Sequence, residues 1–597
     1  MKRKLVFKTI AENESIKFDT LCELMQAKSS EQKKRLSRIV KTFAKSGRVE
    51  VNYSSGEIKL SPGAKKQIEK EKTADKPATP VPNLKKKSKF IPKTKSDNTP
   101  QTDLDRIIDK YKIRNRFPSA ALRELESVPV SIPDSEIKRR LDIRDNLVFT
   151  IDGIDAKDLD DAVSLDEKKD GWIIGVHIAD VSYYVDKGSK LDREAIRRGN
   201  SFYFIDRVIP MFPELLSNGV CSLNPNEDKL TMSIFIHISR EGDIQSYEIR
   251  ETVIRSRHRL NYNSLERFLK GKETYPDKQL ASTLRKLDDI FRILNNKRMQ
   301  SGGIDFNFRE QKITLKENGE PAKVWLKERL DSERIVEELM LLANRCVAKF
   351  LFERGISIFR IHDEPSAEKI QDFIRIAMRF GHKIYGVPTP APLEIQKVLR
   401  EAEGKPHKEF VTHILLRSMQ QARYQTENIG HYGLGFEYYT HFTSPIRRYA
   451  DLIVHRLIKN AIAPDTNKSK YDEEELDSVS AHISSCERVA MEAEREFYKI
   501  KSIRFMKDRV GQVFDGVVSG VSVFGIFVQI IQFGNEGLVR YMDMNDDYYT
   551  YSEADYTAKG RKSKTVYSIG DKVKVEVVKV NVDRGYLDLN FVNSEDN

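Results

Sequence analysis

The sequence predicts a multidomain protein of mixed α/β (α+β) class: a large α/β domain, then a small β-barrel. Its 597 residues allow several domains at roughly 150 residues each. Strand-type apolar runs alternate with helix-type runs over residues 147–507, as expected for one large α/β domain. Residues 511–591 instead alternate apolar and polar side chains with glycines at the bends, which indicates a small closed barrel.

The first 62 residues have the pattern of a small winged-helix domain. We expect one helix around residues 15–25 and a second over residues 31–45, where apolar side chains recur at helical spacing. Residues 49–60 are expected to form a hairpin that turns at residues 54–56. Such a unit binds nucleic acid or a partner protein, or is a folded cap without contacts of its own. The sequence leaves these alternatives open.

Residues 63–100 are predicted to be a disordered basic linker, because they contain eleven Lys against four acidic residues and few large apolar side chains. The linker is a solubilising spacer, a nonspecific tether for phosphates, or both. The next segment, residues 101–146, is predicted to be a lead-in that is helical in its first half. With a net charge of +12 for the whole chain, a polyanionic partner is plausible.

The cysteines and the N-terminus exclude several classes. The four cysteines are far apart and form no C-x-x-C motif, so neither a disulfide framework nor a zinc site is indicated. The N-terminus lacks an apolar segment long enough for secretion, and no run of 18 apolar residues exists. We therefore expect a soluble, cytoplasmic protein without a membrane partner.

Five aspartates lie between two strand-type runs, residues 147–151 and 172–178. They are Asp152, Asp155, Asp158, Asp160 and Asp161. Two unpaired carboxylates about 5 Å apart repel by roughly 3 kcal/mol at an effective dielectric constant near 20. A group of four or five must therefore shift its pKa values, point apart, or share a divalent cation.

A solvated acidic turn is the alternative to a metal site. The rigid strands on either side and the D-x5-D-x-D-D spacing favour a hard cation, Mg²⁺ or Mn²⁺, which carboxylate and water oxygens bind well. No Cys/His cluster supports zinc here. Asp155 is the weakest candidate, because an Asp in a turn readily bonds its own backbone.

A second chemical stretch, THFTSPIRRYADLIVHRLI, covers residues 440–458. Thr443 or Ser444 is expected to cap a helix that begins with Pro445. This places Arg447 and Arg448 in the first turn, where free backbone N–H groups and the helix dipole favour phosphate. Surface charge is the alternative, but the aspartate motif elsewhere in the chain favours phosphodiester chemistry.

Both stretches resemble the catalytic blocks of the RNase II/RNB family of 3′→5′ exoribonucleases, and more closely its RNase R branch. The blocks are IDGIDAKDLDDAV with GVHIADVSYYV, and HYGLGFEYYTHFTSPIRRYADLIVHRL. SFYFIDRVIPMFPELLSNGVCSLNPNEDKLTMS and IVEELMLLANRCVA extend the likeness, which covers residues 143–591. It implies an RNB catalytic domain over residues 147–507 and an OB-fold RNA-binding domain of the ribosomal S-one type over residues 508–593.

The resemblance implies a processive, metal-dependent enzyme that hydrolyses single-stranded RNA from its 3′ end to 5′-nucleoside monophosphates, in RNA turnover and quality control. The implied metal ligands are Asp152, Asp158, Asp160 and Asp161. Asp160 would matter most for turnover, and Arg447 would contact the scissile phosphate. The implied RNA-binding residues are Tyr203, Phe306, Glu337, Arg448, Phe524, Phe527 and Arg540.

Some of these RNA contacts have structural alternatives. Tyr203 and Phe306 would stack on the terminal bases, although a lone aromatic is more often core. Glu337 is equally well explained as a solvated or salt-bridged side chain, and Arg448 as a structural partner. Phe527 has a fair chance of being core.

The chain also departs from the family. RNase R-like proteins place two cold-shock domains before the catalytic domain, and residues 101–146 are too few for even one five-stranded barrel. Duplex unwinding therefore stays open, as does binding of structured RNA or the ribosome. The family implies a monomer. A noncatalytic RNA-binding regulator with the same fold is the rival hypothesis, and the presence of all four aspartates argues against it.

Overall fold

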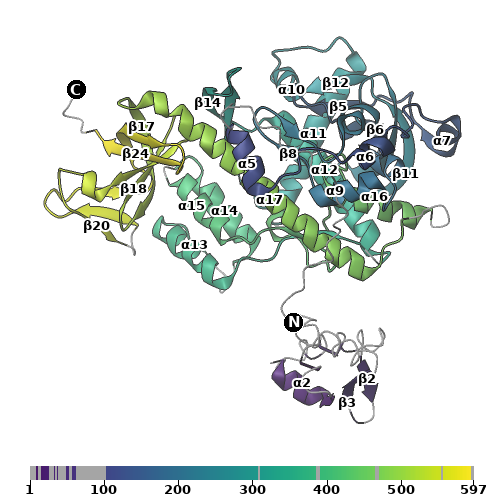
Figure 1. Ribbon diagram of the computed structural model, residues 1–597, viewed down its shortest axis with the longest axis horizontal. Helices are drawn as coiled ribbons and strands as arrows, with labels where there is room; N and C mark the ends of the chain where they lie inside the picture. Colours follow the sequence, from purple (N-terminus) through teal and green to yellow (C-terminus); the bar gives the residue numbers. More distant parts are fainter. Residues whose placement is uncertain are drawn as a thin grey trace, which may run out of the picture. The chain divides into compact units, whose positions relative to one another are not determined.

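The computed structural model describes parts of residues 9–61 and residues 102–592, apart from 307–308, 356, 385–389, 406, 464–468 and 553–555. The chain divides into two compact units, Met1–Thr99 and Pro100–Asn597 (Figure 1). The predicted basic linker lies outside the described residues. Among the described residues, no helix combines the length and the apolar character needed to cross a membrane.

The N-terminal unit contains a three-stranded antiparallel sheet in the order β1-β3-β2 and a short helix. These elements are β1 (Ser15–Lys17), α2 (Phe18–Leu24), β2 (Val49–Asn52) and β3 (Glu57–Leu60). The prediction of helix from residue 15 is wrong, because Ile16 is buried and pairs with Ile58 as part of a strand. The predicted hairpin is confirmed, and most of the second predicted helix lies outside the described residues.

The lead-in is helical, as predicted. It comprises α5 (Asp103–Tyr111), α6 (Ser119–Leu125), α7 (Asp134–Arg139) and the short strand β4 (Leu141–Asp142). The side chain of Thr102 accepts the N–H of Asp105, whose carboxylate accepts in return, so α5 begins with a capping box.

A seven-stranded mixed sheet, in the order β12-β5-β6-β7-β10-β11-β4, organises the large domain. The two outermost pairs are parallel and the inner pairs are antiparallel. The six further strands are β5 (Phe149–Asp152), β6 (Asp161–Lys168), β7 (Gly171–Ala179), β10 (Asp228–Ser239), β11 (Ile244–Arg255) and β12 (His258–Asn261).

The aspartates flank the junction between β5 and β6. Asp152 is the last residue of β5, and Asp161 is the first residue of β6, not part of a loop as predicted. Strand β6 begins there because Ala162 and Val163 are buried, and Val163 pairs with Phe149 of β5. Both carboxylates therefore lie at the same edge of the sheet.

Further helices and short strand pairs lie around this sheet and between it and the C-terminal barrel (Figure 1). The helices are α8 (Val181–Tyr184), α9 (Lys190–Arg198), α10 (Tyr262–Leu269), α11 (Lys278–Gln300), α12 (Asp331–Phe352), α13 (Ala367–Arg379), α14 (Pro392–Ala402), α15 (Lys408–Ser418), α16 (Tyr449–Ile462) and α17 (Glu473–Phe505). The short strand pairs are β8 (Phe202–Tyr203) with β9 (Val208–Ile209), β13 (Glu310–Leu315) with β14 (Pro321–Lys327), and β15 (Phe359–Ile361) with β16 (Arg423–Gln425). Helix α12 packs on the sheet through Ile335, Leu339 and Leu342.

Helix α16 begins later than predicted. Its first residue is Tyr449, and residues 445–447 form a separate turn. Arg448 has an extended backbone because it forms a β-bridge with Asn200, and the Asp451 carboxylate accepts the Ser444 N–H. Arg447 and Arg448 therefore precede the helix. The side chains of Ile446, Tyr449, Ile453 and Leu457 are all buried.

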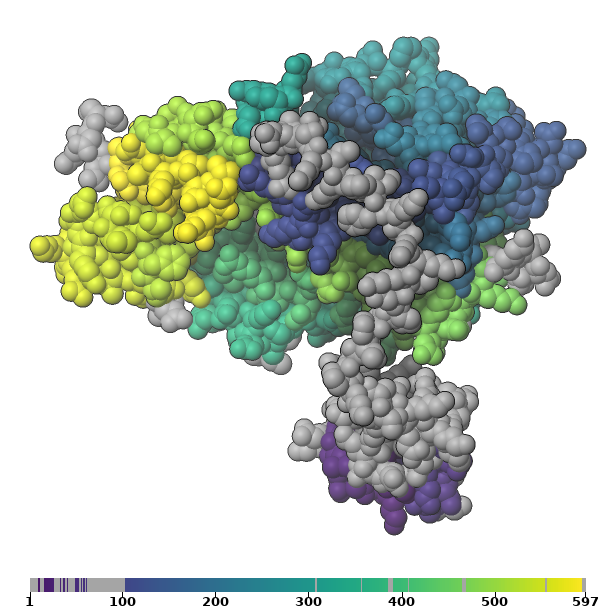
Figure 2. Space-filling model, in the orientation of Figure 1, coloured from purple at the N-terminus to yellow at the C-terminus, as the bar shows by residue number. Residues whose placement is uncertain are grey.

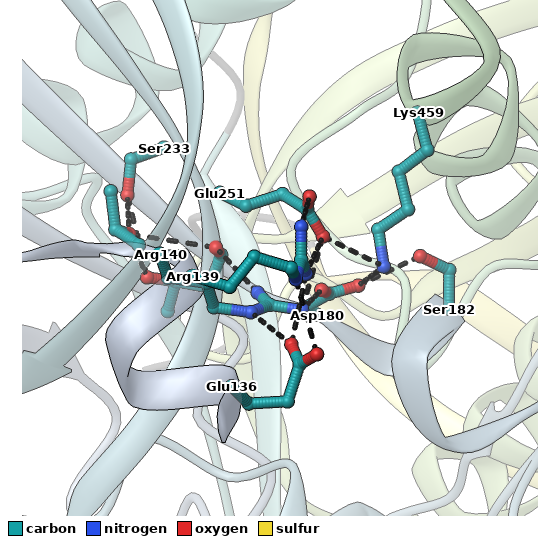
Figure 3. Close-up of polar contacts among 10 residues, drawn as sticks. Glu136, Arg139, Arg140, Asp180, Ser182, Ser233, Glu251 and Lys459 are labelled. Carbon is teal, nitrogen blue, oxygen red and sulfur yellow. Dashed lines mark hydrogen bonds and ion pairs between the residues drawn. The ribbon is translucent and has the colours of Figure 1, made fainter. Parts of the chain in front are cut away.

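A buried ionic network attaches the lead-in to the sheet (Figure 3). The side chains of Arg140 and Asp180 are fully buried and 2.8 Å apart. Lys459 of α16 lies 2.8 Å from the other Asp180 oxygen, to which Ser182 also donates. Glu251 of β11 completes the network 3.1 Å from Arg140. Four segments distant in sequence are thus held together by paired charges.

The C-terminal barrel closes in the order β17-β18-β19-β24-β23 (Figure 2 shows its surface in yellow and yellow-green). Its strands are β17 (Val513–Ser522), β18 (Gly525–Ile530), β19 (Glu536–Arg540), β23 (Lys572–Asn581) and β24 (Tyr586–Phe591). A small sheet of β20 (Tyr549–Ser552), β21 (Thr557–Gly560) and β22 (Val566–Ser568), which the sequence pattern did not predict, follows β19. The closed barrel confirms the predicted architecture of this region.

Candidate active site

All four predicted metal ligands line one cavity of about 290 Å³ at the edge of the sheet. The turn before α16 forms a second side of this cavity with Arg447 and Arg448, and α12 forms a third with Glu337 and Asn344. Asp155 is exposed and does not line the cavity, in keeping with its lower rank.

Three of the aspartates carry raised pKa values. Burial, then the neighbouring carboxylates Asp160 and Asp158, raise the pKa of Asp152. Burial and Asp152 likewise raise the pKa of Asp161. Burial raises the pKa of Asp160 well above its usual range, although Arg447 and the Ile446 N–H oppose this effect. Each carboxylate disfavours ionisation of its neighbours, and the positive charge of Arg447 does not offset the combined effect of burial and these carboxylates.

Two carboxylate oxygens in the cavity are left without hydrogen bonds. Asp152 Oδ2 and Asp160 Oδ2 are buried and have no hydrogen-bond partner. An unsatisfied buried charge is costly, and a hard cation with oxygen ligands would relieve it. The residues present therefore fit a divalent metal. The described residues nevertheless contain no group of three or more His, Cys, Asp or Glu side chains already gathered as a metal site. The carboxylates face one cavity but are not drawn together at a single point.

The two arginines of the turn have different partners. Arg447 Nη2 donates to Ser444 Oγ at 2.9 Å, and Arg447 Nε lies 3.4 Å from Asp160 Oδ2. Its side chain is 42% exposed, so it is accessible from the cavity. Arg448 instead makes two hydrogen bonds of 2.8 Å to Asp451, whose side chain is fully buried. Arg447 is therefore available to a ligand, whereas Arg448 is held by its structural partner.

Tyr203 is connected to the aspartates directly. Its hydroxyl donates to Asp158 Oδ2 at 2.6 Å, and its backbone N–H donates to Glu494 of α17 at the same distance. Phe306 instead packs against the apolar cluster of helices α13–α15. Among the described residues neither aromatic lines the aspartate cavity.

Glu337 lines the cavity and is also salt-bridged, which was one of the two alternatives for it. Its carboxylate pairs with Arg329, and Arg329 Nη1 donates to Asp305 Oδ1 at 3.0 Å. Because Asp305 directly precedes Phe306, this chain of ion pairs connects the cavity wall to the Phe306 loop.

The sequence reasoning missed several residues of the cavity, notably Tyr262, Asn344 and Tyr439. Tyr262 follows β12 directly, and β12 is paired in parallel with β5, so Tyr262 lies beside Asp152 at the same sheet edge. Burial, Asp152 and Asp161 raise the pKa of the Tyr262 hydroxyl. Knowledge of the strand order would have revealed it, because residues after neighbouring parallel strands meet at one edge.

The predicted RNA-binding residues of the barrel lie close together. Phe524 is 55% exposed, and its ring meets that of Phe527 edge to face at 5.9 Å. Arg540 ends β19 and donates to Asp588 at 2.9 Å.

Two family models match the chain. One, described as the RNB domain, matches residues 140–464, and the other, described as the S1 RNA binding domain, matches residues 507–591. Ribonuclease R of Aquifex aeolicus is 39% identical over 493 residues, which are 82% of this chain and 70% of that protein. Ribonuclease R of Escherichia coli is 37% identical over 505 residues, which are 82% of this chain and 62% of that protein.

Solved structures give the same result. Mycoplasma genitalium RNase R, solved in complex with ribose-methylated single-stranded RNA, superposes with a TM-score of 0.77 at 27% identity, over 82% of this chain and 77% of that one. Yeast Ssd1, described as a pseudonuclease, matches with a TM-score of 0.64 at 20% identity, over 77% of this chain and 58% of that one, and therefore shows a shared fold only.

The RNB match over the mixed sheet and its aspartate cavity, together with relatives named Ribonuclease R, defines the exoribonuclease class, and the S1 match assigns the barrel as an RNA-binding domain. The chain belongs to the RNB family, and its relatives there are Ribonuclease R proteins.

Proposed function

We propose that this chain is an exoribonuclease that degrades single-stranded RNA processively from the 3′ end to 5′-nucleoside monophosphates, in RNA turnover. One observation supports this above all others. Four carboxylates and Arg447 line a single cavity, and two of the buried carboxylate oxygens have no hydrogen-bond partner. A fold maintained only for RNA binding has no need of such a costly arrangement.

Asp152, Asp158, Asp160 and Asp161 would hold Mg²⁺, or Mn²⁺ in its place. When bound, the ions supply neutralisation of phosphate charge and a lowered pKa of bound water. The contribution of the chain is to keep these carboxylates at one edge of a rigid sheet. The backbone N–H of Ile446 orients Asp160 by donating to Oδ1 at 2.8 Å.

Arg447 would donate to the non-bridging oxygens of the scissile phosphate. Its guanidinium is held by Ser444 and faces Asp160, so it can stabilise charge that develops during hydrolysis. Tyr203 and Phe306 would stack on the terminal bases, and Glu337 and Arg448 would contact the RNA near them. Stacking on Phe524 and Phe527 and a phosphate contact from Arg540 would add affinity in the barrel.

The test is incubation of labelled single-stranded RNA and DNA of equal sequence, with Mg²⁺ or with EDTA. We expect a ladder of RNA products that shortens from the 3′ end, needs Mg²⁺ and ends in nucleoside monophosphates. A gel shift without cleavage, under both conditions, would instead support the noncatalytic regulator. The shared fold of the Ssd1 pseudonuclease makes that alternative worth testing.

We further propose that the N-terminal unit is a winged-helix domain. Its β2–β3 hairpin, the pairing of β1 with β3 and the buried side chains of Leu21, Leu36 and Val40 support this assignment.

A further inference from the structure

A groove of about 650 Å³ lies between the C-terminal part of α17 and the barrel. We call it the α17–barrel groove. Arg495 and Lys499 of α17 line one side, and Phe524, Arg540 and Tyr586 of the barrel line the other. It is separate from the aspartate cavity, with which it shares no lining residue.

The floor of the groove holds its two sides together. The buried side chain of Asn535 donates to both the carbonyl oxygen and the hydroxyl of Ser502 on α17, at 3.0 and 2.8 Å. Gln311 of β13 donates to the Phe533 carbonyl at 2.7 Å. Because these bonds join α17 and the β13–β14 hairpin to the barrel, the groove is formed before any ligand arrives.

The α17 side presents positive charge. Arg495, Tyr498, Lys499 and Ser502 all line the groove, and their spacing puts them on one face of the helix. Arg495 and Lys499 are exposed. The two cations are one helical turn apart, so they can meet successive groups of a polyanion.

The barrel side presents aromatic rings. Phe524 is 55% exposed and Tyr586 is 58% exposed, and both lie in the groove wall. Large exposed rings opposite cations suit a ligand that has flat apolar groups on one side and negative charge on the other. Single-stranded nucleic acid has this character, because any base can stack while the phosphates stay outside.

We propose that α17 supplies the second wall of an RNA-binding groove, with Arg495 and Lys499 on phosphates and Tyr586 joining Phe524 as a stacking platform. The inference rests on the proposed function and deepens it. It adds residues outside the barrel to the path of the RNA upstream of the reacting 3′ end. An acidic protein segment is the alternative occupant that the test must separate.

The main variant is Arg495→Gln/Lys499→Gln, which removes two charges and keeps long polar side chains. Arg488→Gln is the matched control, because Arg488 belongs to the same helix and does not line the groove. Tyr586→Ala tests the stacking wall. Binding is measured in EDTA, so that affinity does not depend on hydrolysis, with one RNA of about 30 nucleotides and one of about four, shorter than most barrel footprints.

We expect the double variant to bind the long RNA about tenfold more weakly. The slope of log Kd against log salt should fall by about 0.7 for each phosphate that the variant no longer neutralises. In Mg²⁺, the double variant should have a KM for the long RNA about tenfold above that of the wild type. Its KM for the short RNA should stay close to the wild-type value. Tyr586→Ala should weaken binding without changing the salt slope, and Arg488→Gln should match the wild type.

The inference is overturned if the double variant and the control have the same Kd and the same salt slope. The acidic protein segment would then be the favoured occupant of the groove. Equal losses on the long and short RNAs would overturn it too, because they would place the two cations beside the reacting end. If the wild type binds RNA but hydrolyses none, the proposed function fails while the EDTA measurements still decide the groove.

Discussion

The carboxylate of Asp180 and the aspartates of the cavity lie at the same sheet but differ in what surrounds them. Asp180 directly follows β7, and although burial alone would raise its pKa, Lys459 and Arg140 hold the pKa well below its usual range. Asp152, Asp160 and Asp161 flank the neighbouring strands, yet their pKa values are raised. Arg447 lies 3.4 Å from Asp160, whereas Arg140 and Lys459 are each 2.8 Å from Asp180.

The difference distinguishes a carboxylate that is neutralised within the fold from carboxylates that are not. A buried carboxylate that is paired with cations and hydrogen-bonded is part of the folded structure. Removing it leaves its partner cations buried without a counter-charge, which destabilises the fold. A buried carboxylate whose oxygens lack partners destabilises the fold unless a ligand binds to those oxygens. Aspartates at similar places in one sheet thus have different surroundings, and this contrast supports a structural role for one and a ligand-binding role for the others.

The strongest test of this contrast is Asp160→Asn. We expect turnover to fall about a thousandfold or more, because loss of a metal ligand forfeits several kcal/mol of charge stabilisation in the transition state. RNA affinity and the free energy of unfolding should change little. Single-turnover kinetics, RNA binding in EDTA and denaturant unfolding measure the three quantities. Full activity would remove the argument for a metal site.

Asp180→Asn should have the reverse effect. Leaving Arg140 and Lys459 without their buried partner should cost about 3–5 kcal/mol of unfolding free energy. Since the folded pKa is lowered, the contribution of Asp180 is present above its unfolded pKa and lost as pH falls through the folded value. The wild type should therefore lose stability below about pH 4, near the unfolded pKa of Asp, and the variant should lose less. Equal acid sensitivity of the two proteins would contradict this.

Arg447→Ala tests the same contrast by removing the cation that lies beside Asp160. Because Arg447 is partly exposed and faces the cavity, we expect kcat to fall about a hundredfold, as for loss of one transition-state donor. RNA affinity should fall much less. The comparison is kcat against Kd for the same RNA. Equal losses in both would reduce Arg447 to a tether.

The smallest expected effect is stabilisation by metal. At pH 8, saturating Mg²⁺ at about 100 times its Kd should raise the free energy of unfolding by about 2.7 kcal/mol, because only the folded cavity binds it. Asp152→Asn/Asp161→Asn should abolish the effect. Asp155→Asn, an exposed residue of the same loop, should retain it. Thermal unfolding with and without EDTA measures the shift.

The aspartate cavity was largely predictable because its ligands are close in sequence and bounded by strands. The cap of α16 was not, since Thr443–Arg448 is shaped by a bridge to Asn200, far away in the chain. Tyr262 was missed for the same reason, as only the pairing of β12 with β5 places it beside Asp152. The start of β6 at Asp161 was missed because carboxylates are poor signals for strands. The α17–barrel groove depends on packing between domains, which no local pattern encodes.

The lead-in has a practical consequence for dissecting this protein. It begins at the capping box of Thr102, where Asp103 pairs with Lys501 and Arg504 of α17. Near its other end, the buried side chain of Arg140 pairs with Asp180. An N-terminal truncation just after Thr99 removes the residues of one compact unit and none of the other. A truncation just before β5 instead removes Arg140, which pairs with Asp180. It also exposes the apolar side chains of Ala493 and Phe497 of α17, which pack against the lead-in. We expect a chain that starts at residue 100 to keep the whole second unit, whose start lies about forty residues before the matched catalytic domain begins.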